Sequence, residues 1–192
     1  MIKHPAFVIS PSCRDCKLHI DRNKMVWGNG NYRAKLCFIG EGPGRAEDLS
    51  GWAFVGAAGK LLIKILKIMD LSTENILILN LVSCRPPENR NPKSDEIEAC
   101  RKYLDKKLDY SPNVNTIVAL GRVPWKGLTG RTDKVRDNHG MVSKYRKKYR
   151  VVYTFHPSYL KRNPKDIELK KYFIRDIKKA LLLSNRNGIS QS

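Results

Sequence analysis

Four runs of apolar residues divide the chain and predict the strands of a sheet. They lie at residues 35–39, 76–82, 116–120 and 151–155. Polar side chains interrupt these runs only rarely, which is typical of strands whose two faces are both buried. Such strands occur mainly in parallel sheets that are covered by helices on both sides. The pattern therefore predicts a central, mainly parallel four-stranded sheet.

Apolar residues at helical spacing occupy the segments between these strands. They predict helices at residues 59–69 and 124–128, a helix after Ser94, and a closing helix at residues 164–183. Ser94 is a residue type that caps helix N-termini, and the apolar face of its helix would turn Cys100 inward. Strands that alternate with helices in this way define the α/β fold class.

The domain organisation follows from the length of the chain. Its 192 residues suit one domain with a sizeable core. We expect this domain to span residues 1–183, and within residues 131–150 we expect a turn at Asn138-His139-Gly140 that leads into an edge hairpin. Residues 184–192 are polar, and we expect a disordered tail there.

Charge narrows the class of partner. The chain has 37 lysines and arginines against 18 acidic residues, a formal net charge of +19. A surface this basic favours a polyanionic partner, above all nucleic acid, although it can also serve solubility alone. No apolar run approaches the roughly 20 residues that span a bilayer, and the N-terminus lacks the long apolar centre of a signal peptide. We therefore expect an intracellular protein that does not enter membranes.

The five cysteines then indicate metal ligands or buried thiols, because disulfides are rare in reducing compartments. Cys13 and Cys16 form a C-x2-C turn, in which two thiolates can converge on one metal centre. Cys84 and Cys100 follow after 67 and 15 intervening residues, a spacing unlike that of a compact zinc ribbon. Cys37 lies inside the first strand and is interpreted as a core residue.

Four loops follow the carboxyl ends of the four strands, where α/β sheets bind ligands. The first is rich in glycine, a common feature that identifies no ligand by itself. Phe54, among small residues, offers a flat wall beside open backbone amides. Asn80 ends the second strand and needs hydrogen-bond partners, supplied either by the protein or by a ligand. His156 follows the last strand, where a histidine can be structural or functional.

Taken in order, these motifs resemble the family 4 uracil-DNA glycosylases. The resemblance rests on GEGPG at residues 40–44, FVG at 54–56, Asn80, CRPP at 84–87, Asn89-Arg90 and HPS at 156–158. It implies a three-layer α/β/α domain that excises uracil from DNA. It also implies a structural 4Fe-4S cluster held by four thiolates, although such thiolates could also hold zinc; the ligands would be Cys13, Cys16, Cys84 and Cys100.

The resemblance also implies a role for each residue of the site. Phe54 would stack on a uracil rotated out of the helix, and Asn80 would read its N3–H and O4. His156, in its neutral form, would donate to uracil O2, assisted by backbone amides near Gly42. Glu41 and Asn89 are the candidates for holding the attacking water, and the sequence does not rank them.

The DNA contacts implied by the resemblance lie in the loops around the cleft. Phosphates would be bound by Arg85, Arg90, Lys161 and Arg162, and Ser158 would enter the gap left by the flipped base. The chain departs from the family pattern at Trp52-Ala53 and at Ser83. We expect these departures to affect the shape of the loops and the affinity for DNA, and not the chemistry. We expect a monomer that acts on single- or double-stranded DNA and can be recruited by replication or repair proteins.

Two other classes of protein compete with this interpretation. The first is a non-catalytic iron–sulfur or zinc module of the same fold that only binds nucleic acid. The joint presence of Glu41, Phe54, Asn80, Asn89 and His156 argues against it. The second is a Rossmann-type nucleotide-binding enzyme. It is disfavoured because no acidic residue ends a strand about 20 residues after the glycines.

Overall fold

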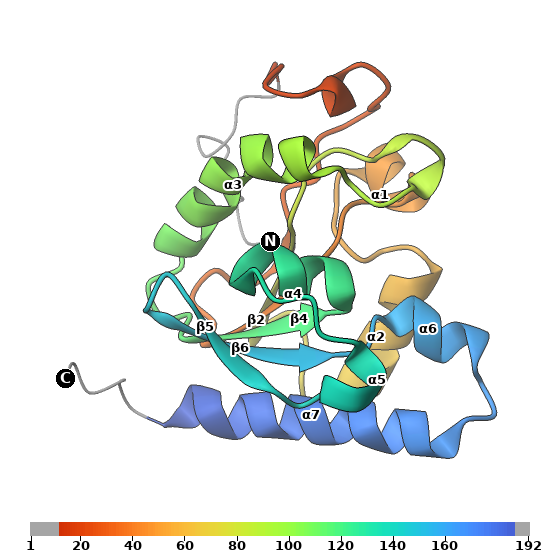
Figure 1. Ribbon diagram of the computed structural model, residues 1–192, viewed down its shortest axis with the longest axis vertical. Coiled ribbons are helices and arrows are strands. Elements are labelled where there is room, and N and C mark those ends of the chain that lie inside the picture. The colour runs from red at the N-terminus through yellow and green to blue at the C-terminus, as the bar shows by residue number, and fades with distance from the viewer. Residues whose placement is uncertain (1–11, 187–192) are drawn as a thin grey trace.

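The computed structural model describes residues 12–186, and these residues form a mixed six-stranded sheet in the order β1-β3-β2-β4-β6-β5 (Figure 1). Strands β2, β3, β4 and β6 run parallel, which confirms the predicted parallel core. Strands β1 and β5 add antiparallel edges. The strands are β1 (Asn29–Gly30), β2 (Leu36–Gly40), β3 (Ile76–Asn80), β4 (Thr116–Leu120), β5 (Val142–Tyr145) and β6 (Tyr149–Thr154).

Helices cover both faces of the sheet, so the predicted three-layer architecture is confirmed. One face packs against α2, α6 and α7, and the opposite face packs against α3 and α4. Figure 1 shows α4 and α7 on opposite sides of β4 and β6. The helices are α1 (Arg45–Ser50), α2 (Ala57–Lys67), α3 (Ser94–Asp109), α4 (Arg122–Thr129), α5 (Val135–Asn138), α6 (Pro157–Arg162) and α7 (Ile167–Asn185), with 3-10 turns at Lys17–His19 and Pro87–Asn89.

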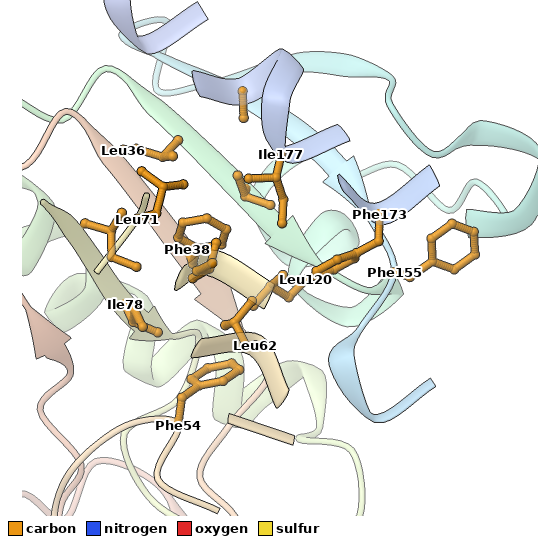
Figure 2. Packing of buried hydrophobic residues seen from close by; sticks show 14 of the residues in the cluster. Leu36, Phe38, Phe54, Leu62, Leu71, Ile78, Leu120, Phe155, Phe173 and Ile177 are labelled. Atoms are coloured by element: carbon orange, nitrogen blue, oxygen red, sulfur yellow. The ribbon is translucent and has the colours of Figure 1, made fainter. Parts of the chain in front are cut away.

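The two cores follow from the period of a strand, in which successive side chains point to opposite faces. Phe38 of β2 contributes to the core under α2 and α7, whereas Cys37 and Ile39 contribute to the core under α3 and α4. Figure 2 shows the first of these cores, with the ring of Phe54 next to Leu62 of α2. Phe54 therefore belongs both to the core and to the end of the sheet at which the functional loops lie.

Several local predictions differ from the structure. Lys93, and not Ser94, is the N-cap of α3, because the Glu96 carboxylate accepts a 2.7 Å hydrogen bond from the Lys93 amide. The closing helix begins three residues later than predicted, where the Asp166 side chain accepts from the Leu169 amide at 2.9 Å. It continues to Asn185, so the first residues of the predicted tail are helical.

One strand and two helices are too short to be predicted from the spacing of apolar residues. Strand β1 has two residues, and α1 and α6 have six residues each, which is too short to display a repeating pattern. The predicted edge hairpin is present as β5 and β6. The rest of the predicted tail and the first 11 residues lie outside the described part of the chain, so the domain limits 1–183 stay a prediction. Across residues 12–186, no helix combines the length and the apolar content needed to cross a membrane.

Candidate active site

A cavity of about 710 Å³ opens at the carboxyl ends of the parallel strands. Its volume lies within the roughly 300–1,000 Å³ that is usual for small-molecule sites. The loops after β2, β3, β4 and β6 all contribute to its walls. Among the residues predicted for the site, those that line the cavity are Glu41, Gly42, Phe54, Asn80, Asn89, Arg90, His156, Ser158 and Arg162. Arg85 and Lys161 do not line it.

Sheet register brings the first two loops together. Gly40, the last residue of β2, pairs with Asn80, the last residue of β3. A Cβ atom at position 40 would come within 2.6 Å of both Asn80 Oδ1 and the ring of Phe54. Only glycine leaves room there, so Gly40 allows the amide and the aromatic ring to approach each other at the base of the cavity.

The Asn80 side chain is buried without being satisfied. Only 6% of the residue is exposed, and its Oδ1 atom has no hydrogen-bond partner among the described residues. A buried polar atom left unpaired costs about 1–3 kcal/mol. Since the residue also lines the cavity, a ligand bound there is one source of the missing hydrogen bond.

The Phe54 ring forms a fixed wall of the cavity. Its backbone lies in the left-handed region, with φ 57°, which is rare for a bulky residue. A Cβ atom at Gly59 would lie 2.0 Å from the Phe54 carbonyl oxygen, so the start of α2 packs directly on this loop. The ring centroid is 6.4 Å from that of His156, at an interplanar angle of 42°. Close packing of α2 therefore holds the Phe54 backbone in a conformation that a bulky residue does not favour.

His156 is the N-cap of α6, and its hydrogen bonds there indicate which ring nitrogen carries the proton. The backbone N–H of Ser158 donates to Nδ1 at 3.2 Å, and Ser158 Oγ lies 2.7 Å from the same atom. Because Nδ1 accepts, we infer that the proton of the neutral ring is on Nε2. Burial, together with the charge of Arg162, lowers the pKa of His156 to about 4. The ring is therefore neutral at pH 7 and presents an N–H donor to the cavity.

Glu41 follows β2 directly and shares the cavity with His156. Burial raises the pKa of this carboxyl group to about 7. Its protonation state therefore changes near neutral pH. A carboxyl group of this kind can orient a water molecule or take up a proton at physiological pH.

The proline-rich loop after β3 is anchored by ionic hydrogen bonds. Arg90 forms a bidentate pair with the Glu96 carboxylate, at 2.8 and 2.6 Å, and the Glu96 side chain is almost fully buried. Arg85 Nε donates to Asn89 Oδ1 at 2.8 Å, and Asn89 itself has a left-handed backbone with φ 57°. Arg90 thus fastens the loop to α3, and Arg85 orients the amide that faces the cavity.

Two residues of the cavity wall, Glu47 and Arg122, were not predicted as site residues from the sequence. Glu47 of α1 accepts a 2.7 Å hydrogen bond from the Gly56 amide and so joins the first loop to the start of α2. Arg122, at the start of α4, adds a cation beside the end of β4. Its place directly after Gly121 at a strand end was the available signal. Nothing in the sequence connects Glu47 with Gly56.

A second, much smaller pocket of about 10 Å³ is lined by all four predicted metal ligands. Arg22 Nη1 donates to Cys84 Sγ at 3.3 Å, and the Ser83 amide donates to Cys100 Sγ at 3.4 Å. Burial raises the pKa of the Cys84 thiol to about 11. No group of three or more Cys, His, Asp or Glu side chains within residues 12–186 has the arrangement of a metal-ion site. Cys37 is fully buried in β2, as predicted.

Together, the aromatic wall, the unpaired amide and the neutral histidine suit a planar ligand that carries both hydrogen-bond donors and acceptors. The fold and the cavity therefore define an α/β domain that handles a nucleobase or a similar ring. Comparison with known proteins agrees with this class, since the family model described as the uracil DNA glycosylase superfamily matches residues 27–180.

Comparison with individual relatives identifies the type within this superfamily. The type-4 uracil-DNA glycosylase of Archaeoglobus fulgidus is 39% identical over 176 residues, which cover 88% of this chain and 86% of the relative. That of Sulfurisphaera tokodaii is 42% identical over 178 residues, with 88% and 78% covered. A type-5 uracil-DNA glycosylase from Thermus thermophilus is 29% identical over 54% of this chain and 53% of its own. The chain belongs to the uracil-DNA glycosylase superfamily and, within it, to the type-4 uracil-DNA glycosylases, which confirms the resemblance seen in its motifs.

Proposed function

We propose that the protein is a monofunctional DNA glycosylase of base excision repair. It hydrolyses the N-glycosidic bond of uracil in DNA and leaves an abasic site. The observation that carries this proposal is the buried, unpaired Oδ1 of Asn80 at the base of a cavity of nucleobase size. The names of the type-4 relatives support the same substrate.

Access to uracil requires that the nucleotide rotate out of the stack, at a cost of a few kcal/mol. Phe54 supplies part of the compensation, since stacking of a base on an aromatic ring is worth about 1–3 kcal/mol. Because Phe54 is only 8% exposed and packs in the core, little side-chain freedom is lost when the base binds. Rigid support of this kind favours a flat ligand over a flexible one.

Asn80 reads the identity of the base. Its Oδ1 accepts from uracil N3–H, and its Nδ2 donates to uracil O4. Cytosine presents an acceptor at N3 and a donor at N4. With cytosine, the acceptor Oδ1 would therefore face an acceptor, and the donor Nδ2 would face a donor. A site that leaves buried polar groups unpaired can reject the wrong ligand by factors of about 10⁴–10⁵.

His156 stabilises the leaving uracil. Cleavage of the glycosidic bond places negative charge on uracil O2 and positive charge on the sugar. The Nε2–H of the neutral ring donates to this oxygen, with backbone amides near Gly42 assisting. One donor of this kind is worth about 2.7–4 kcal/mol in the transition state. The neutral ring is suitable because a cationic ring would lose the cap that Nδ1 makes with Ser158.

Glu41 and Asn89 hold the water that attacks the sugar carbon. The ionised Glu41 carboxylate also stabilises positive charge on the sugar. Asn89 accepts from Arg85 through Oδ1, so its amide nitrogen is the group left to donate to water. Both residues line the cavity on the side of the proline-rich loop and the first loop.

The pH dependence of kcat/KM tests the role of Glu41. Because the pKa of the free enzyme's carboxyl group is raised to about 7, activity should rise as pH increases through this value and the carboxylate forms. Glu41→Gln should lower kcat/KM and remove this rise. The measurement is uracil release between about pH 5 and 9. Glu74→Gln, in an exposed turn, is the matched control and should keep the wild-type profile. A wild-type profile that is flat through neutral pH would exclude this role.

Basic residues around the cavity bind the DNA backbone. Arg162 lines the cavity, while Arg85 and Lys161 lie outside it and would reach the flanking phosphates. Arg90 is already paired with Glu96, so its contribution is to position the loop, with only its remaining N–H groups available for phosphate. Ser158 lines the mouth and would enter the space left by the flipped base. A monomeric state, recruitment by replication or repair proteins, and an intracellular location stay predictions.

We also infer that the four-cysteine pocket holds a structural 4Fe-4S cluster. Four thiols from three separate segments share one pocket, which fits the four thiolate ligands of such a cluster. When bound, the cluster would link the N-terminal segment, the proline-rich loop and α3. Zinc is the alternative ion for the same thiolates.

Cys84→Ser tests this assignment. It should reduce iron and sulfide content, weaken the broad visible absorbance of the protein, and lower its melting temperature, because one of four ligands is lost. Cys37→Ala is the control, since Cys37 is fully buried in β2 and outside the pocket. If the wild type contains stoichiometric zinc and no iron, the pocket is a zinc site and the cluster assignment is wrong.

The activity itself is tested with labelled oligonucleotides that contain U·G, U·A, single-stranded U or T·G. Treatment with alkali after incubation reveals abasic sites as strand breaks. We expect breaks in the uracil substrates and none at T·G. Binding without breaks in any uracil substrate would favour the non-catalytic module of the same fold.

A further inference from the structure

Lys107 of α3 is buried, although no carboxylate in the described part of the chain neutralises it. Only 2% of the residue is exposed, and its Nζ donates to the neutral Ser83 Oγ at 2.9 Å. Among the described residues, no acidic side chain forms an ion pair with it, and burial lowers its pKa to about 8. A buried cation without a counter-charge is costly, so the surroundings of Lys107 need a negative partner.

The nearest candidates for this partner are cysteine thiolates. Ser83 precedes Cys84 in the chain, and its amide donates to Cys100 Sγ at 3.4 Å. Cys100 lies two helical turns before Lys107 on the same helix, so both side chains face the same direction. Negative charge on Cys100, Cys84 or Cys37 raises the pKa of Lys107, and the Lys107 cation in turn lowers that of Cys100.

Arg22 and Lys107 are two of the cations near the pocket, and they differ in their exposure to solvent. Arg22 contacts Cys84 directly and is partly exposed. Lys107 lies in the interior, behind Ser83, where water does not screen its charge. The Lys107 charge therefore interacts with the cysteine pocket more strongly than a solvent-exposed charge would.

We propose that Lys107 is the buried counter-cation of the four-cysteine centre, acting through Ser83 to stabilise the anionic cluster. This inference rests on the cluster assigned above. Four thiolates outweigh the positive charge of the inorganic core, so the assembled centre is anionic and supplies the charge that Lys107 lacks. Lys107 is thus a positioning residue for the cofactor and does not touch DNA or the reacting atoms.

Lys107→Met tests the proposal in the protein purified with its cluster. Removing the cation should reduce iron bound per chain, speed the loss of visible absorbance under a chelator several-fold, and make the midpoint potential of the cluster more negative. The potential moves in this direction because reduction adds negative charge that the ammonium would stabilise. Lys106→Met is the matched control, since Lys106 is exposed on the same helix and should behave as the wild type in all three measurements.

If Lys107→Met does not fold, Lys107→Arg and Ser83→Ala test the same proposal. Lys107→Arg retains the charge and should keep the potential close to that of the wild type. Ser83→Ala removes the hydrogen bond to the ammonium and should speed cluster loss. A Lys107→Met protein with unchanged iron content, chelator resistance and potential would overturn the proposal. Wild-type protein without iron would overturn both the cluster and this inference, and its uracil excision, assayed separately, would still report on the glycosylase function.

Discussion

Asn80→Ala should lower kcat/KM for uracil excision by roughly 30-fold or more, because two hydrogen bonds to a buried base are lost at about 1–3 kcal/mol each. The same change should leave the folded protein as stable as the wild type, or more stable. The reason is that Asn80 Oδ1 has no hydrogen-bond partner within residues 12–186, so its removal eliminates a buried unsatisfied atom. Steady-state kinetics on a U·G duplex and thermal melting measure the two effects.

A loss of activity without a loss of stability distinguishes a ligand-reading residue from a structural one. Asn185→Ala, at the exposed end of α7, is the matched control and should change neither quantity. DNA affinity should fall only slightly for Asn80→Ala, since phosphate contacts supply most of the binding energy. Strong destabilisation of the Asn80→Ala protein, or near-wild-type excision, would contradict the assignment.

His156→Asn should lower kcat by about 10²–10³-fold, the usual cost of one lost donor to a developing oxyanion. Asparagine is a strong N-cap residue, so its side chain can accept from the Ser158 amide and retain the start of α6. It cannot place a donor where Nε2–H lies, because it is shorter than histidine. Single-turnover rates on uracil-containing DNA, together with melting temperature, separate the lost donor from a lost cap.

Ser158→Ala provides the comparison for this prediction. It removes the hydroxyl near Nδ1 but leaves the backbone N–H that holds the ring in its tautomer. Its effect on kcat should therefore be much smaller than that of His156→Asn. Equal losses in the two variants would show that the orientation of the ring, and not its donor, limits the reaction.

The central sheet could be predicted because its strands are buried on both faces. The apolar run around Phe38 and that of residues 116–120 have no other stable location than the interior of a parallel sheet. The edges could not be predicted in the same way. Strand β1 depends on pairing with β3, and the cap of α3 depends on a carboxylate three residues along the helix, which replaces the role expected for Ser94.

The candidate site was predictable where it coincides with strand ends. Asn80, Glu41 and His156 follow parallel strands, so one edge of the sheet brings them together. Residues whose position depends on loop conformation were harder to place. Arg85 lies outside the cavity, and Arg90 pairs with Glu96, because the turn at Asn89 directs these side chains in a way that the sequence does not reveal.

Release of the free base is the most direct test of the account as a whole. The protein is incubated with a U·G duplex, and the products are separated and identified by mass spectrometry. We predict free uracil in amounts equal to an intact strand that carries one abasic sugar. Strand cleavage without free uracil, release of a deoxyuridine nucleoside, or binding that leaves the duplex unchanged would contradict hydrolysis of the glycosidic bond.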